Sequence, residues 1–534
     1  MHAAKVLSGF FASSLILLVA CTVAKTAPDA IMPSPTAAAL SPEDMRGPED
    51  LPYYDVAWAK ALTIDAMHVR VMSRAQAEDA DIIEVQYDAF DQPIATEDGV
   101  KVVRWRQRGW LILPRTILHE GKAVALNIHD VDGGDKDNPR SSVGMGVDVA
   151  RAFGIPVLIH GWMPDVVADV DGRSFHDTQV MAFKRLLAAH ITSADELPMD
   201  GRYLFNGNPL AKADMVSMTL LQRLVQQERG EAITEIGSMG ISKEGASHWI
   251  LGALDDRVTV LGPGGYYAHD AQETYDRYGK DTDWRFPWKD GDRPEYDGLR
   301  DLFATFWKFL DWQVSTDAGR LVARTTTDPV NWYSTIKARQ VLVFGDLGTV
   351  PGQHDGPWPF WAENKPLSSF KHPSWRYVRA FDGSGVLMDQ AGIGEMGLSM
   401  LPQLSDALVN DTQLPGTPSI AVAQVADRQV EVSAKAKTTP GLAHEALLLY
   451  AISSERGLRD PGTWQIAPMT ETGSNSWTLQ LPPVPDDNGL TFIVVVREKA
   501  TAGDLSYWRS ASSMPMERFP VPQFNRPGPN WTDR

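Results

Sequence analysis

The residues with the clearest chemical pattern lie in the short stretch Gly-Ile-Ser-Lys-Glu-Gly, from Gly240 to Gly245. An apolar run that begins at Ile233 precedes this stretch, and a helical pattern follows it. A sharp strand–turn–helix junction with small flanking residues is typical of the turn that presents a nucleophilic serine. Ser242 is therefore the candidate nucleophile, and the backbone N–H of Lys243 at the helix start is a candidate donor to an oxyanion. A serine that only caps a helix on a tight turn would show the same local pattern.

A second loop carries groups that could serve the same reaction. The stretch from His129 to Asn138 follows an early apolar segment and contains two adjacent glycines. Loops at this place in a hydrolase supply further N–H donors to an oxyanion, so Gly133 is a second candidate donor. The four aspartates of the loop lack a glutamate at the spacing of a calcium loop, which favours a solvated acidic loop. We expect neither a metal site nor a cofactor.

The elements that must position these loops are short apolar segments that alternate with helical stretches. Apolar strands separated by helices indicate a parallel sheet with both faces covered. The expected fold class is therefore α/β, with a doubly wound, mostly parallel sheet. A helix over 210–227 carries one apolar stripe, and Gly230 stands where a C-cap glycine belongs. The predicted strands begin at Ala123, Ile155, Ile233, Arg257 and Arg339.

Both ends of this α/β unit carry predicted β-structure. Two strands that begin at Asp81 and Val100 form an N-terminal β extension, and a hairpin turn at Arg108-Gly109 is expected to interrupt the second. After residue 418, short strands separated by Pro, Gly and Asp turns predict an all-β sandwich. The predicted domains are thus 53–412 and 418–517, with a loose tail over 518–534.

One insertion in the α/β unit stands out by composition. The segment from Trp284 mixes aromatic and polar residues and lies between two predicted core strands. We interpret it as a lid whose tryptophans could line a groove for a sugar or peptide. Packing of this segment onto the core is the alternative.

The N-terminus has the pattern of a secretory signal. Lys5 is followed by an apolar run over 6–20 that is too short to span a bilayer comfortably. The run ends in Leu-Val-Ala-Cys, and Cys21 is the single cysteine of the chain. This end resembles the lipobox of bacterial lipoproteins, in which the cysteine is lipidated, and a cleaved signal with a chance cysteine is the alternative. Residues 22–52 are rich in Ala, Pro, Ser and Thr and predict a disordered tether.

Charge limits the class of partner. The chain has 50 basic and 68 acidic residues, a formal net charge of −18. Nucleic-acid binding needs a basic surface, so a nucleic-acid partner is not expected. The expected partners are a membrane, through lipid at Cys21, and an unidentified small-molecule, peptide or glycan ligand. The expected location is the bacterial envelope, as a periplasmic or outer-membrane-anchored lipoprotein.

Over most of residues 100–515, the chain resembles the PhoPQ-activated pathogenicity-related proteins of the α/β-hydrolase superfamily. The resemblance implies an α/β-hydrolase-like sheet and a serine-hydrolase site, with this chain as a divergent member. Its segments keep a shared order along the chain. They are NPLAKADMVSMTLLQRLVQ from Asn208, GISKEGASHWILGALDDRV from Gly240, DPVNWY from Asp328, GDLGTVPG from Gly345 and YAISSERGLRD from Tyr450.

The resemblance also implies the members of a catalytic triad. Ser242 falls on the family's nucleophile and Asp346 on its acid. The family's histidine follows the next strand, but no histidine occurs here over 374–392. A serine hydroxyl attacks only when a base accepts its proton, so this departure bears directly on activity. His354 and His372, in the loops before that strand, are the candidates to replace the missing base.

Two functions follow from these residues. The first is a lipid-anchored serine hydrolase that cleaves an ester or amide outside the cytoplasm. The second is a catalytically decayed pseudohydrolase that serves as a binding module of the cell envelope. The missing histidine favours the second function, and the intact serine turn favours the first.

Overall fold

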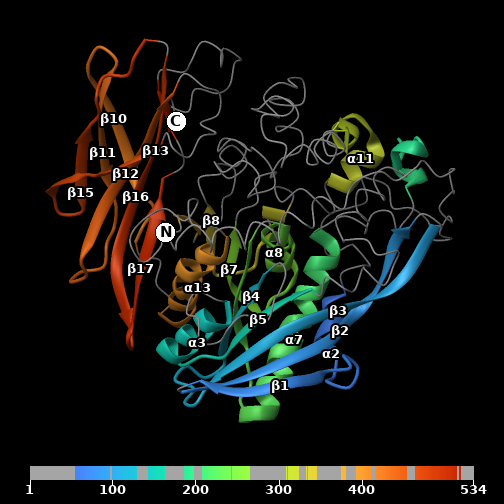
Figure 1. Cartoon of the computed structure of the whole chain (residues 1–534). Coiled ribbons are helices and arrows are strands. Elements are labelled where there is room, and N and C mark those ends of the chain that lie inside the picture. The colour runs from blue at the N-terminus through green and yellow to red at the C-terminus, as the bar shows by residue number, and fades with distance from the viewer. Residues whose placement is uncertain are drawn as a thin grey trace, which may run out of the picture.

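The computed structural model describes a α/β unit joined to a β-sandwich (Figure 1). The predicted signal, tether and lid segment from Trp284, and the predicted tail after Arg518, lie outside the described residues. Among the described residues, no helix has the length and apolar character needed to cross a bilayer. The described residues are 55–77, 79–96, 99–128, 142–162, 186–197, 207–241, 243–264, 308–309, 311–323, 332–333, 335–345, 375–379, 393–410, 415–453, 464–486, 488–513 and 516–518.

The frame of the molecule is a mixed sheet, to which the described residues contribute 14 strands. Its centre is a parallel block in the order β5-β4-β6-β7-β8-β9. All of these strands except β9 are among the apolar segments that the sequence predicts, and the α/β class is confirmed. The strands of the block are β4 (Lys122–Asn127), β5 (Val157–Trp162), β6 (Glu235–Ile241), β7 (Val258–Gly264), β8 (Gln340–Gly345) and β9 (Trp375–Arg379).

Helices cover both faces of the parallel block, which explains why β4 to β8 are apolar nearly throughout. Alternate residues of β4 divide between two cores: Ala123 and Ala125 join one, and Val124 and Leu126 join the other. The first core contains α7 (Gly207–Arg229) and α8 (Lys243–Leu254), and the second contains α3 (Ser142–Phe153) and α13 (Ile393–Asn410).

The expected end of α7 is confirmed. Gly230 follows the helix with a positive φ of 72°, and its N–H donates to the carbonyl of Gln226 at 3.0 Å. Glycine adopts this left-handed conformation without the cost that other residues meet.

A small separate core holds η2 (Ala194–Glu196) and α11 (Asp317–Val322) together.

A buried arginine fixes the turn between α8 and β7. Arg257 donates to both carboxylate oxygens of Asp255, at 2.9 and 2.6 Å. It also donates to Thr219 Oγ1, Gln222 Oε1 and the carbonyl of Met215, all on α7. The Asp-Arg pair that follows the serine helix in the sequence therefore ties that helix and its strand to α7.

The N-terminal extension is an antiparallel arm on one edge of the sheet. Its strand β3 runs without a break through Arg108 and Gly109, so the hairpin turn expected there is wrong. Gly109 pairs with Val85 and His160, and a Cβ on it would lie 3.2 Å from the carbonyl oxygen of Ile159. The glycine serves close strand packing rather than a turn. The arm consists of α2 (Val56–Ala61), β1 (Arg70–Ala77), β2 (Ala80–Thr96) and β3 (Gly99–Pro114).

The C-terminal residues form the expected sandwich. An apolar core that includes Val432, Leu448 and Val494 lies between its two layers. One layer is a four-stranded sheet of β10 (Ser419–Ala426), β11 (Gln429–Lys435), β15 (Ser476–Gln480) and β14 (Thr470–Gly473). The other comprises β12 (His444–Ser453), β13 (Trp464–Pro468), β16 (Gly489–Ala502), β17 (Leu505–Ser512) and β18 (Met516–Arg518).

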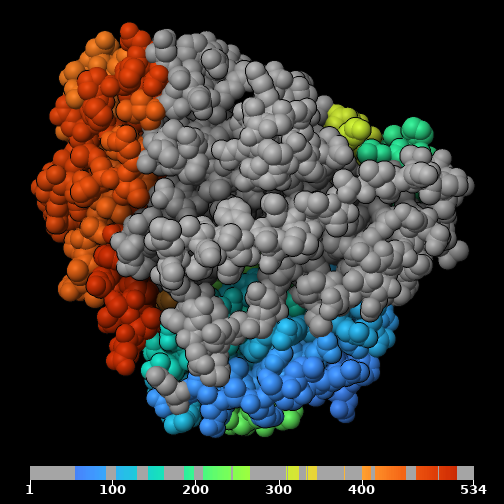
Figure 2. All heavy atoms as spheres, in the orientation of Figure 1, coloured from blue at the N-terminus to red at the C-terminus, as the bar shows by residue number. Residues whose placement is uncertain are grey.

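The second layer of the sandwich continues the sheet of the α/β unit. β17 pairs antiparallel with β9, with Ser512 opposite Tyr377. Figure 2 shows the sandwich along one side of the molecule and the N-terminal arm along another. The sheet therefore runs from β1 of the arm to β13 of the sandwich.

Buried charges reinforce this junction. Arg509 on β17 contacts Asp406 on α13 at 3.2 Å and Glu498 on β16 at 2.9 Å, and all three side chains are buried. Gln403 on α13 accepts a hydrogen bond from the backbone N–H of Ser510 at 2.8 Å. A buried charge is costly to leave unpaired, so α13 and the sandwich depend on each other.

Candidate active site

The predicted serine turn lies between a strand and a helix that are separated by a single residue, as a nucleophile turn requires. β6 ends at Ile241 and α8 begins at Lys243, so the chain passes from strand to helix at position 242. Ser242 itself lies outside the described residues. The start of α8 places the backbone N–H of Lys243 in the first turn of a helix, where N–H groups are free to bind an anion.

Two glycines make this junction possible. A Cβ on Gly240 would lie 2.7 Å from the carbonyl oxygen of Glu244 and 2.7 Å from His248 Nδ1. A Cβ on Gly245 would lie 2.0 Å from the carbonyl oxygen of Gly264 at the end of β7. The first glycine lets α8 lie against β6, and the second lets it lie against β7. The glycine three residues after the serine thus provides the close contact that a serine turn needs.

The ends of three neighbouring strands meet beside this turn. Ile241 pairs with Gly264, and Gly264 pairs with Phe344 of β8. Ser242 directly follows β6 and Asp346 directly follows β8, so both positions come after strand ends at one edge of the sheet. These strand ends are about 10 Å apart, since adjacent strands lie about 4.8 Å apart. The carboxyl edge of a parallel sheet is where such folds place their sites.

His248 holds the serine helix to the sheet. Its Nδ1 lies 2.7 Å from the carbonyl oxygen of Glu244, so Nδ1 donates and Nε2 accepts from the Ser238 hydroxyl at 2.9 Å. The ring is fully buried, and burial lowers its pKa to about 4. Both ring nitrogens are therefore occupied within the core. His248 positions α8 and does not serve as the base for Ser242.

A buried aspartate connects the serine helix to the strand before the second loop. Asp214 on α7 accepts a hydrogen bond from Asn127 Nδ2 at 2.5 Å and another from Ser247 Oγ at 2.9 Å. Asn127 is the last residue of β4, and Ser247 is in α8. Burial raises the pKa of Asp214 well above its ordinary value, against the two hydrogen bonds, which lower it. Asp214 thus links α8 to the strand that precedes the loop of Gly133.

A second buried histidine adjoins this aspartate. His160 near the end of β5 is fully buried, with Nε2 3.9 Å from Asp214 Oδ1. Neither of its ring nitrogens has a hydrogen-bond partner among the described residues. Burial lowers its pKa to about 3, and the nearby His248 acts in the same direction. His160 is therefore a neutral ring beside Asp214.

Several predicted site residues lie outside the described part of the chain. They are Ser242, Gly133, Asp346, His354, His372 and Cys21.

The sequence did not predict the buried group of Asp214, Asn127 and His160. Its only signal was a polar residue within an otherwise apolar strand or helix stripe. The described residues contain no group of three or more His, Cys, Asp or Glu side chains that could hold a metal.

The strand order defines the fold. From β2 the order is β2-β3-β5-β4-β6-β7-β8-β9, and β3 is antiparallel to both of its neighbours. This order, with a strand-to-helix junction after β6, is that of the α/β-hydrolase fold.

No protein-family model matches the chain, and no curated protein matches its sequence. Solved structures that align with it include three hydrolases. Acetyl xylan esterase 1 from Thermoanaerobacterium sp. is 16% identical, with 66% of this chain and 94% of that chain covered and a TM-score of 0.35. An S-formylglutathione hydrolase from Agrobacterium tumefaciens is 10% identical, with coverages of 58% and 90% and a TM-score of 0.30. A rice cell wall degrading esterase from Xanthomonas oryzae is 10% identical, with coverages of 64% and 98% and a TM-score of 0.35. Since these scores are low, the fold assignment rests on the strand order.

Proposed function

We propose that the protein is a serine hydrolase that cleaves an ester or amide, with Ser242 as the nucleophile. The observation that carries the proposal is the junction of β6, α8 and β7, where Gly240 and Gly245 leave no room for a Cβ. A serine that only caps a helix on an ordinary turn does not require the helix to lie this close to the strand before it or to the neighbouring strand. Attack of the Ser242 oxygen on the substrate carbonyl forms a tetrahedral oxyanion, which the N–H groups of Lys243 and the Gly133 loop would stabilise.

The proton of Ser242 needs an acceptor. His248 has both ring nitrogens bonded within the core, and His160 is fully buried. We therefore assign the base to His354 or His372, with Asp346 as the carboxylate that orients it. Loss of a triad histidine leaves about 10³–10⁴-fold catalysis over water in known serine enzymes. If a loop histidine serves as the base, we expect slow turnover, but faster than in an enzyme that has lost its triad histidine.

The test is active-site labelling of the purified protein with a fluorophosphonate probe. Ser242→Ala should abolish labelling, and either His354→Ala or His372→Ala should slow it strongly. His119→Ala is the matched control, because His119 precedes β4 at the opposite edge of the sheet. Labelling that persists in Ser242→Ala, or that no histidine variant changes, would contradict these roles.

A catalytically decayed pseudohydrolase is the second candidate. It is favoured by the absence of a histidine over 374–392, where the resembling family has its triad base. In that case the probe does not label the wild-type protein at any pH tested, although cooperative thermal unfolding shows that the protein is folded. Such a protein would use the site to bind a peptide, glycan or small molecule in the envelope.

We further propose that the protein is a divergent PhoPQ-activated pathogenicity-related protein and is anchored through lipid at Cys21 in the bacterial envelope. The support is the shared order of the resembling segments and the single cysteine at the end of the apolar leader. Cys21→Ser should move the protein from the membrane fraction to the soluble periplasmic fraction. An unchanged membrane fraction would count against the anchor.

A further inference from the structure

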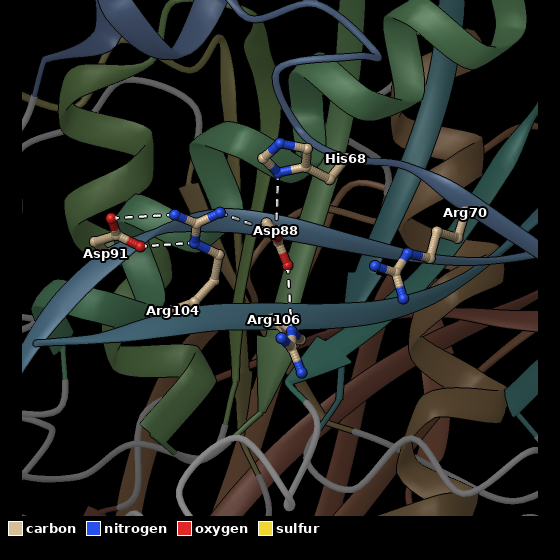
Figure 3. A pocket seen from close by; sticks show the side chains of 6 residues that line it. All are labelled: His68, Arg70, Asp88, Asp91, Arg104 and Arg106. Atoms are coloured by element: carbon tan, nitrogen blue, oxygen red, sulfur yellow. Dashed lines mark hydrogen bonds and ion pairs between the residues drawn. The ribbon is translucent and has the colours of Figure 1, made fainter. Parts of the chain in front are cut away.

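A charged hollow of about 550 Å³ opens on the N-terminal arm, apart from the serine turn in the sequence (Figure 3). Its lining comes from β1, β2 and β3 and from the residue two positions before β1. All of its side chains are charged or ionisable. They are His68, Arg70, Asp88, Asp91, Arg104 and Arg106.

Asp88 organises the cations of the hollow. Its side chain is 19% exposed, the most buried of the ion-paired residues there. One carboxylate oxygen lies 3.1 Å from His68 Nδ1, and the other lies 3.4 Å from Arg106 Nε. These two contacts leave His68 Nε2 and both terminal nitrogens of Arg106 without an ion pair among the described residues. Asp88 therefore fixes two side chains, and the terminal N–H donors of Arg106 remain unused among the described residues.

The remaining two arginines differ sharply. Arg104 is occupied, because it contacts Asp91 at 2.8 Å and Asp88 at 3.4 Å. Arg70 is exposed and forms no ion pair within the described part of the chain. Three guanidinium groups thus face two carboxylates, which leaves a formal charge of +1 in a chain whose net charge is −18. This surplus is carried by Arg70 and the outer edge of Arg106.

The register of the strands sets the distance between these two arginines. Arg70 pairs with Gln86, and Arg106 pairs with Asp88, so both arginines project from the same face of the arm. They stand two strands and two residues apart, about 12 Å between backbones. Each guanidinium can reach several ångströms inward from its own backbone. The spacing suits a ligand with two anionic groups better than a single small ion.

We propose that this hollow binds a ligand that carries two phosphate or carboxylate groups, one on Arg70 and one on Arg106. Guanidinium groups offer paired N–H donors that match the oxygens of either group. Asp88 supplies the orientation of Arg106 and His68, so less freedom is lost when the ligand binds. Because the site is open to water, binding should weaken as ionic strength rises.

The test is equilibrium dialysis of the full-length protein against radiolabelled pyrophosphate at low ionic strength. We expect one saturable site per chain, with a Kd that is raised about fivefold in Arg70→Gln and again in Arg106→Gln, since each loses one charged contact at an exposed position. Arg115→Gln is the matched control, because Arg115 is similarly exposed and pairs with Asp79 outside the hollow. Its Kd should equal that of the wild type.

A competition arm separates the two kinds of ligand. Displacement of pyrophosphate by malonate would support a dicarboxylate ligand, and resistance to malonate would support a diphosphate ligand. Absence of a saturable site, or equal binding by the Arg70→Gln/Arg106→Gln double variant, would overturn the proposal. Melting temperatures of all variants at high salt, where the surface ion pairs are screened, show that each one is folded.

Discussion

Gly245→Ala is the sharpest test of the serine turn, because its cost can be worked out from the packing. The new Cβ would lie 2.0 Å from the carbonyl oxygen of Gly264, about 1 Å closer than Cβ atoms approach other atoms. The obstacle is the backbone of a central strand, so it cannot rotate away as a side chain can. Overpacking typically costs 1–3 kcal/mol, and we expect about 3 kcal/mol here.

Thermal unfolding measures this cost. A loss of about 3 kcal/mol corresponds to a fall in Tm of about 6–12 °C on the scale of 150–250-residue domains. Fluorophosphonate labelling should fall in parallel, because the backbone can relieve the contact only by moving α8 away from β7. Labelling is measured well below the melting temperature of the variant, so that unfolding does not contribute.

Two other glycines make matched controls. Gly473→Ala places its Cβ in open space, and its unfolding free energy should change by no more than about 0.5 kcal/mol. Gly230→Ala also meets no neighbour, but its φ of 72° costs about 1 kcal/mol for a residue with a side chain. If the Tm of Gly245→Ala lies within a degree of the Tm of Gly473→Ala, α8 does not lie as close to β7 as described.

Three further predictions concern buried charge. The wild type should lose stability as the pH rises from 3.8 through the raised pKa of Asp214, because the folded state holds the proton of this carboxyl more tightly than the unfolded chain does. In Asp214→Asn, the free energy of unfolding in urea should not show this fall with pH over the same range. His160→Leu should leave the free energy of unfolding near pH 7 almost unchanged but raise it by about 2 kcal/mol at pH 5. In the wild type, His160 has a pKa of about 3 in the folded state and 6.5 in the unfolded chain, so at pH 5 only the unfolded chain takes up the proton and folding is opposed. Equal acid sensitivity of the wild type and this variant would contradict the assigned burial. Arg509→Met should cost about 3–5 kcal/mol, since it leaves Asp406 and Glu498 buried without their cation, and the loss should be smaller in the Arg509→Met/Asp406→Asn/Glu498→Gln triple variant.

The sequence predicted the buried strands well and the exposed ones poorly. β4, β6 and β7 are covered on both faces, so their apolar runs were readable without knowledge of their neighbours. β1 and β10 were missed, and both are mostly exposed strands at the edge of a sheet. The residues of β1 show little apolar pattern, and the apolar residues of β10 do not alternate with polar ones. Gly109 was misinterpreted because a glycine that allows close strand packing looks the same in sequence as a glycine in a turn.

The candidate site divides in a similar way. Local spacing was enough to predict the strand-to-helix junction between Ile241 and Lys243, since its glycines act within a few residues of that junction. The hydrogen bonds of Asp214 join residues from β4, α7 and α8 that are far apart in sequence. The charged hollow depends on the register between β1, β2 and β3, which the composition of each strand does not reveal. Such groups become visible only when the fold brings them together.

The pairing of β17 with β9 also affects how the protein can be divided. A sheet that ended at β9 would leave a row of unpaired N–H and C=O groups, which readily recruit strands from other molecules. Expression of the α/β unit alone, ending after Asn410, would expose that row together with the buried side of α13. The shortened protein should therefore aggregate, and genetic separation of the two units would require a designed cap for β9.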